Sequence, residues 1–362
     1  MTVYLGKNSF IQLLQSILRE NQQQLFLVTG KKSFAVSQAK DIIFSLFPKK
    51  QFTIFSNFST NVKFKEALDG CRKFYDSRAN IIIGVGGGSV IDMAKLISIG
   101  SPDEDKFLQI IMGRNTITRD AKLYCSPTTA GSGSEATHFA VIYLNDQKYS
   151  IAHERLLPDS ISVDPSLSAS MSPYLTACSG FDALSHAIEA YWAKGWTSAS
   201  RKFSKQSIEL ILPNIQEAVQ NPTERTRALM AEGSYIAGKA INISKTTAPH
   251  ALSYYLTTKF SIPHGHAVAL LVGHFFQANK KNIPNDLYSM LGLTSANDCC
   301  TFWYDMMKKC FLETSLLRLG VTQNDVENMA LSVNEERLSN NPVLFNKTDL
   351  KHIVNTLYQT ER

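Results

Sequence analysis

Asp182 and His186 are four residues apart in the stretch 180–191, which is rich in apolar residues and contains no glycine or proline after Gly180. This pattern predicts a helix, and on a helix both side chains lie on one face. A carboxylate and an imidazole so placed form half of a divalent metal site. Such pairs also arise by chance on solvated helices. The apolar neighbours of His186 favour burial, however, and a buried ionisable pair is costly without a partner.

Two later segments carry histidines that could complete the site. His250 closes the segment 248–250, and His264 and His266 lie in the segment 262–266. We expect Asp182, His186, His250 and His264 to form one metal site. Three imidazoles and one carboxylate suit Fe²⁺ and Zn²⁺ about equally.

The elements that must position these residues fall into two groups. Between about residues 25 and 164, short β-branched or aromatic runs at 25–29, 52–55 and 81–85 alternate with helical patterns at 33–47 and 61–75. This order predicts a parallel sheet with helices on its faces, which binds ligands at the carboxyl ends of its strands.

After Asp164-Pro165 the patterns become helical, and strand-like stretches almost vanish. Long helices are predicted at 175–193, 200–215, 223–242, 267–278 and 301–319. We therefore expect residues 1–165 to be an α/β dinucleotide-binding domain and residues 166–362 to be a helical domain that carries the metal site and the catalytic residues.

A strand, a glycine turn and a helix start occupy residues 81–95, with Gly86, Gly87 and Gly88 at the turn and Ser89 and Asp92 after it. Such a turn lets the backbone approach a ligand, and the N–H groups at a helix N-terminus favour a pyrophosphate. The alternative is a glycine turn that only packs tightly. The sequence matches neither the GxGxxG fingerprint nor a Walker A motif.

A second polar turn at 126–135 follows the apolar strand 123–125. Its hydroxyl residues include Thr128, Thr129 and Ser132. The proline and glycines of this turn predict a shaped loop instead of an arbitrary surface segment. Two such loops on neighbouring strands could hold one dinucleotide.

Composition limits the classes of protein that remain. The chain has 362 residues, of which 44% are hydrophobic and 19% charged, as in globular proteins with two cores. The basic groups behind the net charge of +6 are scattered, which favours acidic small molecules as ligands over nucleic acid.

The six cysteines show no framework spacing, which favours reduced thiols. Without a secretion signal or an apolar run longer than 267–276, we expect a cytoplasmic protein that does not span a membrane.

The chain resembles the iron-containing (group III) alcohol dehydrogenase family, whose architecture is shared with glycerol dehydrogenase and dehydroquinate synthase. The resemblance runs from the first strand to about residue 276. It rests on the motifs Gly86-Gly87-Gly88-Ser89-x-x-Asp92-x-x-Lys95, 128–135, Leu157-Pro158-Asp159 to Asp164-Pro165, Gly180-x-Asp182-Ala183-Leu184-x-His186-Ala187-x-Glu189, and Pro263-His264-Gly265. It implies that Asp182, His186, His250 and His264 are the metal ligands, and it favours iron.

The resemblance also implies an NAD(P)-linked oxidoreductase. NAD-preferring members usually carry an aspartate just after the first strand, where this chain has Gly30-Lys31-Lys32. Loss of the carboxylate and gain of two cations predict NADPH over NADH, although the lysines could also be a solvated pair at a helix start. By family position Lys148 is a further cofactor contact. The expected cofactor-binding residues are Gly30, Lys31, Gly86, Gly87, Gly88, Ser89, Asp92, Thr128, Thr129, Ser132 and Lys148.

One position departs from the family. Members often have a second histidine four residues after the third ligand, and Tyr254 stands there. The proton relay could run through Tyr254, through His266 or through water, so Tyr254 and His266 are the candidate catalytic residues.

Three stretches, 134–143, 148–153 and 248–254, resemble the phosphonoacetaldehyde reductase branch. This implies reduction of phosphonoacetaldehyde to 2-hydroxyethylphosphonate, with cations among His138, Lys148, Arg155 and His266. Alternatives are an enzyme of the same family for neutral aldehydes or diols, such as lactaldehyde or butanal, and a dehydroquinate synthase-like lyase. The expected partners are a small aldehyde or alcohol and a second copy of the chain in a homodimer.

Overall fold

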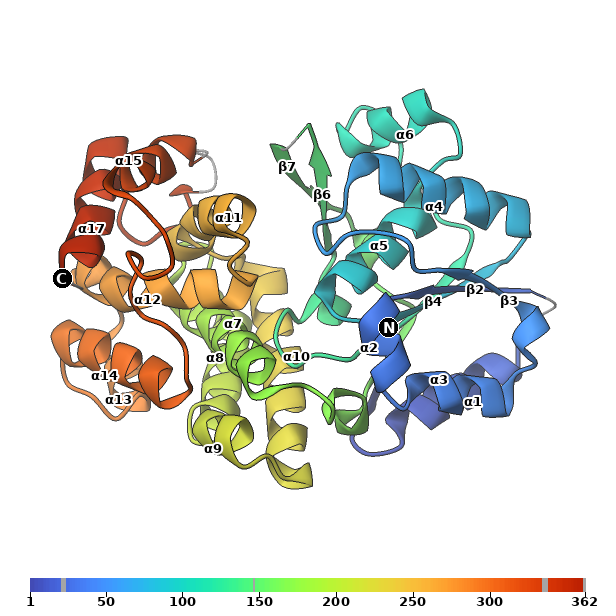
Figure 1. The fold of residues 1–362 in the computed structure, drawn as a ribbon, viewed down its shortest axis with the longest axis horizontal. Coiled ribbons are helices and arrows are strands. Elements are labelled where there is room, and N and C mark those ends of the chain that lie inside the picture. The colour runs from blue at the N-terminus through green and yellow to red at the C-terminus, as the bar shows by residue number, and fades with distance from the viewer. Residues whose placement is uncertain (21–23, 146, 334–337, 361–362) are drawn as a thin grey trace. The chain divides into compact units, whose positions relative to one another are not determined.

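A computed structural model describes residues 1–20, 24–145, 147–333 and 338–360 of the protein. The chain divides into two compact units, Met1–Ser170 and Met171–Arg362. Figure 1 shows the first unit in blue to green and the second in green to red. The division lies between Ser170 and Met171, after a short 3-10 helix at Pro165–Ser168.

A six-stranded parallel sheet forms the centre of the first unit, with strand order β1-β8-β5-β4-β2-β3. Its strands are β1 (Thr2–Leu5), β2 (Leu25–Thr29), β3 (Phe52–Phe55), β4 (Ile81–Gly86), β5 (Lys122–Pro127) and β8 (Ser160–Val163). A separate antiparallel pair consists of β6 (Phe139–Leu144) and β7 (Gln147–Ala152). The predicted parallel α/β fold is confirmed.

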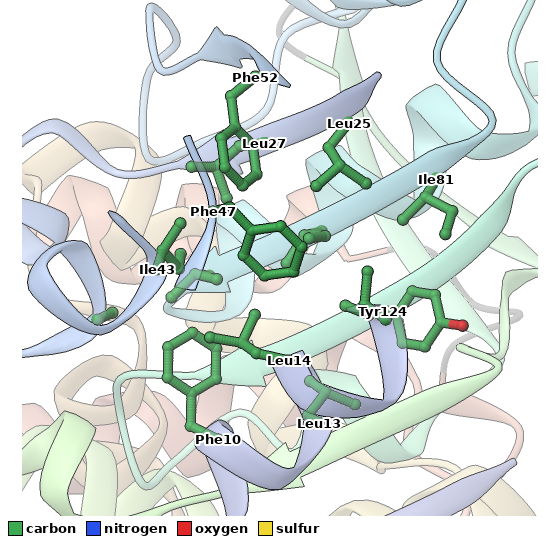
Figure 2. Close-up of a cluster of buried hydrophobic side chains, with 14 of the residues drawn as sticks. Phe10, Leu13, Leu14, Leu25, Leu27, Ile43, Phe47, Phe52, Ile81 and Tyr124 are labelled. Atoms are coloured by element: carbon green, nitrogen blue, oxygen red, sulfur yellow. The ribbon is translucent and has the colours of Figure 1, made fainter. Parts of the chain in front are cut away.

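Helices cover both faces of this sheet (Figure 1). They are α1 (Ser9–Leu18), α2 (Lys31–Val36), α3 (Ala39–Leu46), α4 (Phe64–Ser77), α5 (Gly88–Ile99) and α6 (Glu104–Ile111). Figure 2 shows one core cluster, in which Phe10, Leu13 and Leu14 of α1 lie with Leu25 and Leu27 of β2. Phe26, the residue between those two leucines, instead packs edge-to-face on Phe74 of α4. Strand alternation thus buries β2 on both faces, which explains its unbroken apolar run.

In the described residues of the second unit, every regular element is a helix. Its helices are α7 (Pro173–Trp192), α8 (Ser198–Ile211), α9 (Ile215–Gln220), α10 (Glu224–Ser244), α11 (Ala248–Phe260), α12 (His264–Asn279), α13 (Asn285–Met290), α14 (Ala296–Lys309), α15 (Gln323–Ser332) and α17 (Lys347–Thr360). Helix α7 packs against α8, α9, α10 and α12, and α11 packs against α12. The elements that carry the candidate metal ligands are therefore neighbours.

Several predicted helix boundaries were wrong, for local reasons. The helix predicted at 33–47 is two helices, because Ser37 adopts an extended conformation between them. The helix predicted at 200–215 ends at Ile211; Leu212 still has helical backbone angles, but Pro213 has no N–H with which to continue the hydrogen-bond pattern. The helix predicted at 301–319 starts earlier, at Ala296 after the Ser295 cap, and ends at Lys309, two residues before Phe311 adopts a φ of 61°.

Candidate functional site

Helix α7 holds two of the predicted metal ligands in the interior of the second unit. The helix begins at Pro173, behind a Ser172 side chain that accepts a hydrogen bond from the Leu175 N–H. It is buried from Thr176 to Trp192. Asp182 and His186 are accordingly only 6% and 5% exposed. The helix predicted from the spacing of these residues is present, and it places both side chains away from solvent.

Three imidazoles converge on one carboxylate oxygen. The Nε2 atoms of His250, His186 and His264 lie 3.5, 3.9 and 4.0 Å from Asp182 Oδ1. A tetrahedral ion with ligand distances of about 2.1 Å has neighbouring donor atoms about 3.4 Å apart. The ligand atoms of Asp182, His186 and His250 all lie within 4.8 Å of one another, a spacing that can hold one transition-metal ion. His264, whose Nε2 lies 4.0 Å from Asp182 Oδ1, is the fourth candidate, and we call Asp182, His186, His250 and His264 the four-residue cluster.

Two buried polar atoms of the cluster support this fit. Asp182 Oδ1 and His250 Nε2 are both buried and have no hydrogen-bond partner. Unpartnered buried polar atoms are rare because each costs desolvation energy. The three imidazole Nε2 atoms lie around Asp182 Oδ1, and His250 Nε2 is one of them. A cation among these atoms would therefore satisfy both. The His264 side chain is 37% exposed while the other three are at most 9% exposed, which leaves the cluster open on the His264 side.

The charges around the cluster also favour a cation. Burial favours the neutral acid of Asp182, but His186 and the other two imidazoles outweigh it and hold the pKa of this carboxyl well below its usual range. Burial likewise disfavours the imidazolium of His250, yet the Glu189 and Asp182 carboxylates raise its pKa to about 9. The two carboxylates thus make the site attractive to positive charge.

A second carboxylate, Glu189, lies behind the cluster on α7. Its Oε1 atom contacts Nδ1 of His250, the ring nitrogen that faces away from Asp182. Its Oε2 accepts hydrogen bonds from the backbone N–H and the hydroxyl of Thr247, both at 2.7 Å. Glu189 therefore connects α7 to the segment that leads into α11.

The start of α12 approaches α7 at van der Waals distance, and Gly265 permits this. A Cβ atom at Gly265 would lie 2.0 Å from the Cys178 carbonyl oxygen and 2.8 Å from Cβ of Asp182. His264, the first residue of α12, can reach Asp182 only because the next residue has no side chain.

The two predicted catalytic residues lie in different surroundings. Tyr254 stacks on His264, with ring centroids 5.6 Å apart and an interplanar angle of 2°. His266 is 1% exposed, its Nε2 lies 2.6 Å from the carbonyl oxygen of Glu313, and its Nδ1 lies 3.0 Å from the Tyr174 hydroxyl. Because a carbonyl only accepts, Nε2 donates and Nδ1 accepts from Tyr174. Burial lowers the pKa of His266, and the ring links α12 to Tyr174 of α7 and to the segment that follows α14.

The two polar turns predicted to bind a dinucleotide meet at the carboxyl ends of β4 and β5, which are neighbouring strands. The Thr128 N–H donates to the Gly86 carbonyl at 2.9 Å. A Cβ atom at Gly88 would lie 2.7 Å from Oγ of Ser132, so glycine is required for this approach. Gly88 opens α5, whose first N–H groups lack helical acceptors. Thr128 Oγ1 is buried without a hydrogen-bond partner, as expected of a cradle that a polar ligand completes.

Later residues of the glycine motif hold the second turn in place. Asp92 accepts hydrogen bonds from the Ser134 hydroxyl at 2.5 Å and from the Val141 N–H at 3.1 Å. Lys95 is fully buried, and its Nζ donates to the carbonyls of Ser134, Thr137 and Phe139 at 2.5, 2.7 and 2.8 Å. These contacts tie α5 to residues 134–141 and give Asp92 a structural task in addition to its predicted cofactor contact.

The remaining cofactor candidates surround the cradle in the first unit. The Ser89 hydroxyl donates to the Thr60 carbonyl, which anchors the turn to the loop after β3. Gly30 caps α2, and Lys31 Nζ donates to Oδ1 of Asn57 at 2.8 Å. Lys31 also lines a cavity of about 470 Å³ with Lys65, Ser59 and two carboxylates. Lys148 lies on β7 opposite Tyr143.

Sequence reasoning assigned no role to Glu189, Thr247 or Gly265, although the first and last stand in the quoted motifs. A signal was present for Glu189. It follows Asp182 by seven residues and therefore falls on the same helical face as Asp182 and His186. The clash at Gly265 and the contact of Thr247 with Glu189 depend on how the helices pack, so nothing in the local pattern could reveal them.

Two further findings concern the whole chain. All six cysteines are buried free thiols. Among the described residues, no helix combines the length and the apolar character needed to cross a membrane.

Comparisons with known proteins now identify the family. Residues 1–165 match the family model "Iron-containing alcohol dehydrogenase", and residues 176–358 match the model for the C-terminal part of that family. A "Long-chain-alcohol dehydrogenase 1" from Geobacillus thermodenitrificans is 35% identical over 61% of this chain, and the match spans 58% of that enzyme's own length. An "NADPH-dependent butanol dehydrogenase" from Clostridium saccharobutylicum is 29% identical over 76% of each chain.

Solved structures agree with these matches. Sulfoacetaldehyde reductase from Bifidobacterium kashiwanohense, solved in complex with NAD⁺, superposes with a TM-score of 0.91 at 26% identity, over 99% of this chain and 97% of the other. A 1,3-propanediol oxidoreductase superposes with a TM-score of 0.90 at 27% identity, over 98% and 97%. The chain therefore belongs to the iron-containing alcohol dehydrogenase family, a family of NAD(P)-linked oxidoreductases that act on CH–OH groups.

Proposed function

We propose that the protein is a divalent-metal-dependent, NAD(P)H-linked aldehyde reductase and alcohol dehydrogenase whose metal ligands are Asp182, His186, His250 and His264. The observation that carries the proposal is the convergence of three imidazole Nε2 atoms on Asp182 Oδ1, each within 4.0 Å. Family membership favours Fe²⁺ as the ion, and the same donor set accepts Zn²⁺.

Different residues of this chain have different roles in the proposed reaction. A bound ion would polarise a carbonyl oxygen, and a bound nicotinamide would supply the hydride. The four-residue cluster holds the ion, and Glu189 fixes the ring of His250 behind it. The turn at 86–88 and residues Thr128, Thr129 and Ser132 bind the dinucleotide phosphates through N–H and hydroxyl groups. Tyr254, stacked on His264, holds the proton that the product alkoxide takes up.

For the substrate we propose phosphonoacetaldehyde, which is reduced to 2-hydroxyethylphosphonate. Sulfoacetaldehyde, after which one structural relative is named, is likewise a short aldehyde with a terminal oxyanion group. Among the four candidate cations, His266 is the weakest because burial lowers its pKa and both ring nitrogens are engaged. The charge would then come from His138, Lys148 and Arg155.

A neutral aldehyde or diol is the second candidate substrate. Its support is that relatives of this chain are named for long-chain alcohols, butanol and 1,3-propanediol. A dehydroquinate synthase-like lyase would use its dinucleotide without net consumption, and the matches to both alcohol dehydrogenase models support the oxidoreductase instead.

For the cofactor we propose NADPH in preference to NADH. The support is the cavity that Lys31 and Lys65 line, where a 2′-phosphate would find two ammonium groups. Two carboxylates line the same cavity: Asp69 is paired with the cation of Lys73, and Glu66 accepts hydrogen bonds from Ser59. Relatives include enzymes named for NADPH and for NAD.

The deciding experiment measures NADPH oxidation by Fe²⁺-loaded protein with phosphonoacetaldehyde, sulfoacetaldehyde, propanal and lactaldehyde at matched concentrations. We expect a specificity constant for the phosphonate about a hundredfold above that for propanal, or roughly 2.7 kcal/mol of discrimination in the transition state. A preference for sulfoacetaldehyde would support an anionic aldehyde as the class of substrate but would replace the phosphonate by the sulfonate. Equal turnover of neutral aldehydes would refute the phosphonate proposal, and no oxidation with any aldehyde would refute the reductase.

We further propose that the enzyme acts in the cytoplasm as a homodimer. The support for the compartment is that six free thiols fit a reducing environment. Sedimentation velocity of the purified protein tests the dimer, and a species of monomer mass across the micromolar range would contradict it.

A further inference from the structure

A chain of buried groups runs from Trp192 to the four-residue cluster. The Trp192 Nε1–H donates to Thr247 Oγ1 at 3.0 Å, and the Thr247 hydroxyl and N–H both donate to Oε2 of Glu189 at 2.7 Å. Glu189 Oε1 in turn contacts Nδ1 of His250. All four side chains are at most 2% exposed, so water cannot substitute for any of these partners.

Groups that can only donate fix the direction of two of these hydrogen bonds, because the Trp192 indole N–H donates to Thr247 Oγ1 and the Thr247 N–H donates to Glu189. The Thr247 N–H can only donate, so Oε2 of Glu189 must accept. A carboxylate accepts at its other oxygen too, and Nδ1 of His250 therefore carries the proton. In the neutral ring, which is the form that can bind an ion, the lone pair is then on Nε2, which lies 3.5 Å from Asp182 Oδ1.

We propose that Glu189 is a positioning residue that selects the Nδ1–H tautomer of His250 and thereby makes Nε2 its metal-binding atom. The inference rests on the metal centre of the proposed function. Carboxylates behind ligating imidazoles orient the ring and raise its basicity in metal sites generally. Here the residue that orients the ligand stands on α7, the helix that supplies Asp182 and His186, so one helix controls three of the four ligands.

Glu189→Gln separates this role from packing, because glutamine has nearly the same shape. The Thr247 N–H still requires an acceptor, so the amide oxygen takes the place of Oε2 and the amide NH₂ faces His250. Nδ1 must then accept, and the proton moves to Nε2. The variant thus keeps the volume of the side chain but changes the tautomer of His250, so that Nε2 carries a proton instead of the lone pair that should bind the ion.

Thr247→Val is the matched control. It removes the hydroxyl from the same buried chain but keeps the backbone N–H, so Glu189 still accepts and the tautomer of His250 is unchanged. If the chain only stabilises the fold, both variants should lower the melting temperature and the metal affinity together. If Glu189 selects the tautomer, only Glu189→Gln should weaken metal binding out of proportion to its loss of stability.

The experiment titrates full-length apo protein with Zn²⁺ against a competing chelator and records melting temperature in parallel. We expect one ion per chain, a Kd raised about 10- to 100-fold in Glu189→Gln, and a Kd within about threefold of the unchanged protein in Thr247→Val. An unchanged Kd in folded Glu189→Gln overturns the inference. Failure of the unchanged protein to bind Zn²⁺, or equal binding by His264→Ala, refutes the proposed metal centre instead.

A spectroscopic readout covers the case in which Glu189→Gln does not fold. The ¹⁵N-histidine spectrum of the unchanged, zinc-loaded protein, assigned with His250→Gln, should show His250 protonated at Nδ1 and bound through Nε2. A His250 resonance with the proton on Nε2 overturns the inference without any variant of Glu189.

Discussion

The phenol ring of Tyr254 lies parallel to the imidazole of His264, with 5.6 Å between ring centroids and 2° between ring planes. His264 is the most exposed member of the four-residue cluster. Tyr254 follows His250 by one turn of α11, and α11 packs against α12, whose first residue is His264. The residue that replaces the usual histidine of the family thus flanks the open side of the candidate metal centre.

This arrangement leads to a prediction for Tyr254→Phe. Phenylalanine keeps the stack on His264 and removes only the hydroxyl, so kcat for aldehyde reduction should fall about 10²- to 10⁴-fold while metal content stays the same. Tyr254→His, which restores the usual residue of the family, should recover part of the rate. Steady-state kinetics with metal analysis test this. Full activity of Tyr254→Phe would show that another group donates the proton to the product.

Gly265→Ala should damage the metal centre without touching a ligand. The new methyl group would overlap the Cys178 carbonyl, from which it would be 2.0 Å away, so the start of α12 must move away from α7. We expect a loss of about 1–3 kcal/mol in the free energy of unfolding and at least a tenfold weaker metal affinity, because His264 moves with α12.

The control for that variant is Gly113→Ala. Gly113 has a φ of +69°, and no heavy atom lies within 4 Å of the place that a methyl group would take, so its substitution adds backbone strain of about 1–2 kcal/mol without crowding. Denaturant unfolding and Zn²⁺ titration of both variants make the comparison. Equal metal affinity in Gly265→Ala and the unchanged protein would show that α12 tolerates the shift.

Lys31→Ala should lower the preference for NADPH. Its ammonium group lies at Asn57 on the wall of the cavity proposed for the 2′-phosphate. Because the side chain is exposed, screening limits the effect, and we expect KM for NADPH to rise about three- to tenfold with KM for NADH unchanged. Lys280→Ala, an exposed lysine in the other unit, is the control. A parallel rise in both KM values would place Lys31 outside phosphate recognition.

His274 should make the protein sensitive to acid. Burial lowers its pKa to about 4, against an ordinary value of 6.5. The unfolded chain therefore binds the proton more readily, and stability falls as pH decreases below about 6.5 until the folded pKa is passed. We expect His274 to account for about 2 kcal/mol lost between pH 7 and pH 5.

The measurement is denaturant unfolding of the unchanged protein and of His274→Gln at both pH values. The variant should be less stable at pH 7, since its new side chain fits the site less well, but should lose less stability on acidification. His352→Gln, at an exposed site on α17, serves as the control. An identical loss in His274→Gln would mean that other groups cause the acid sensitivity.

Features that depend on local spacing could be predicted from the amino-acid sequence. The helix with Asp182 and His186 on one face, the strand-turn-helix at residues 81–95 and the alternation that builds a parallel sheet are all short-range patterns, and the structure contains each of them. The predicted helix boundaries were wrong in places, because the end of a helix can depend on one residue within an otherwise helical pattern. The extended Ser37 and the end of α8 before Pro213 are examples.

Contacts between residues far apart in the chain required the folded structure. Whether His250 and His264 reach Asp182 depends on the packing of α11 and α12 against α7, and on the missing side chain at Gly265. The roles of Lys95 in holding the second polar turn and of His266 in linking α12 to α7 follow from partners more than 35 residues away. A residue type indicates which bonds a group can make, but only the fold determines which partner is within reach of it.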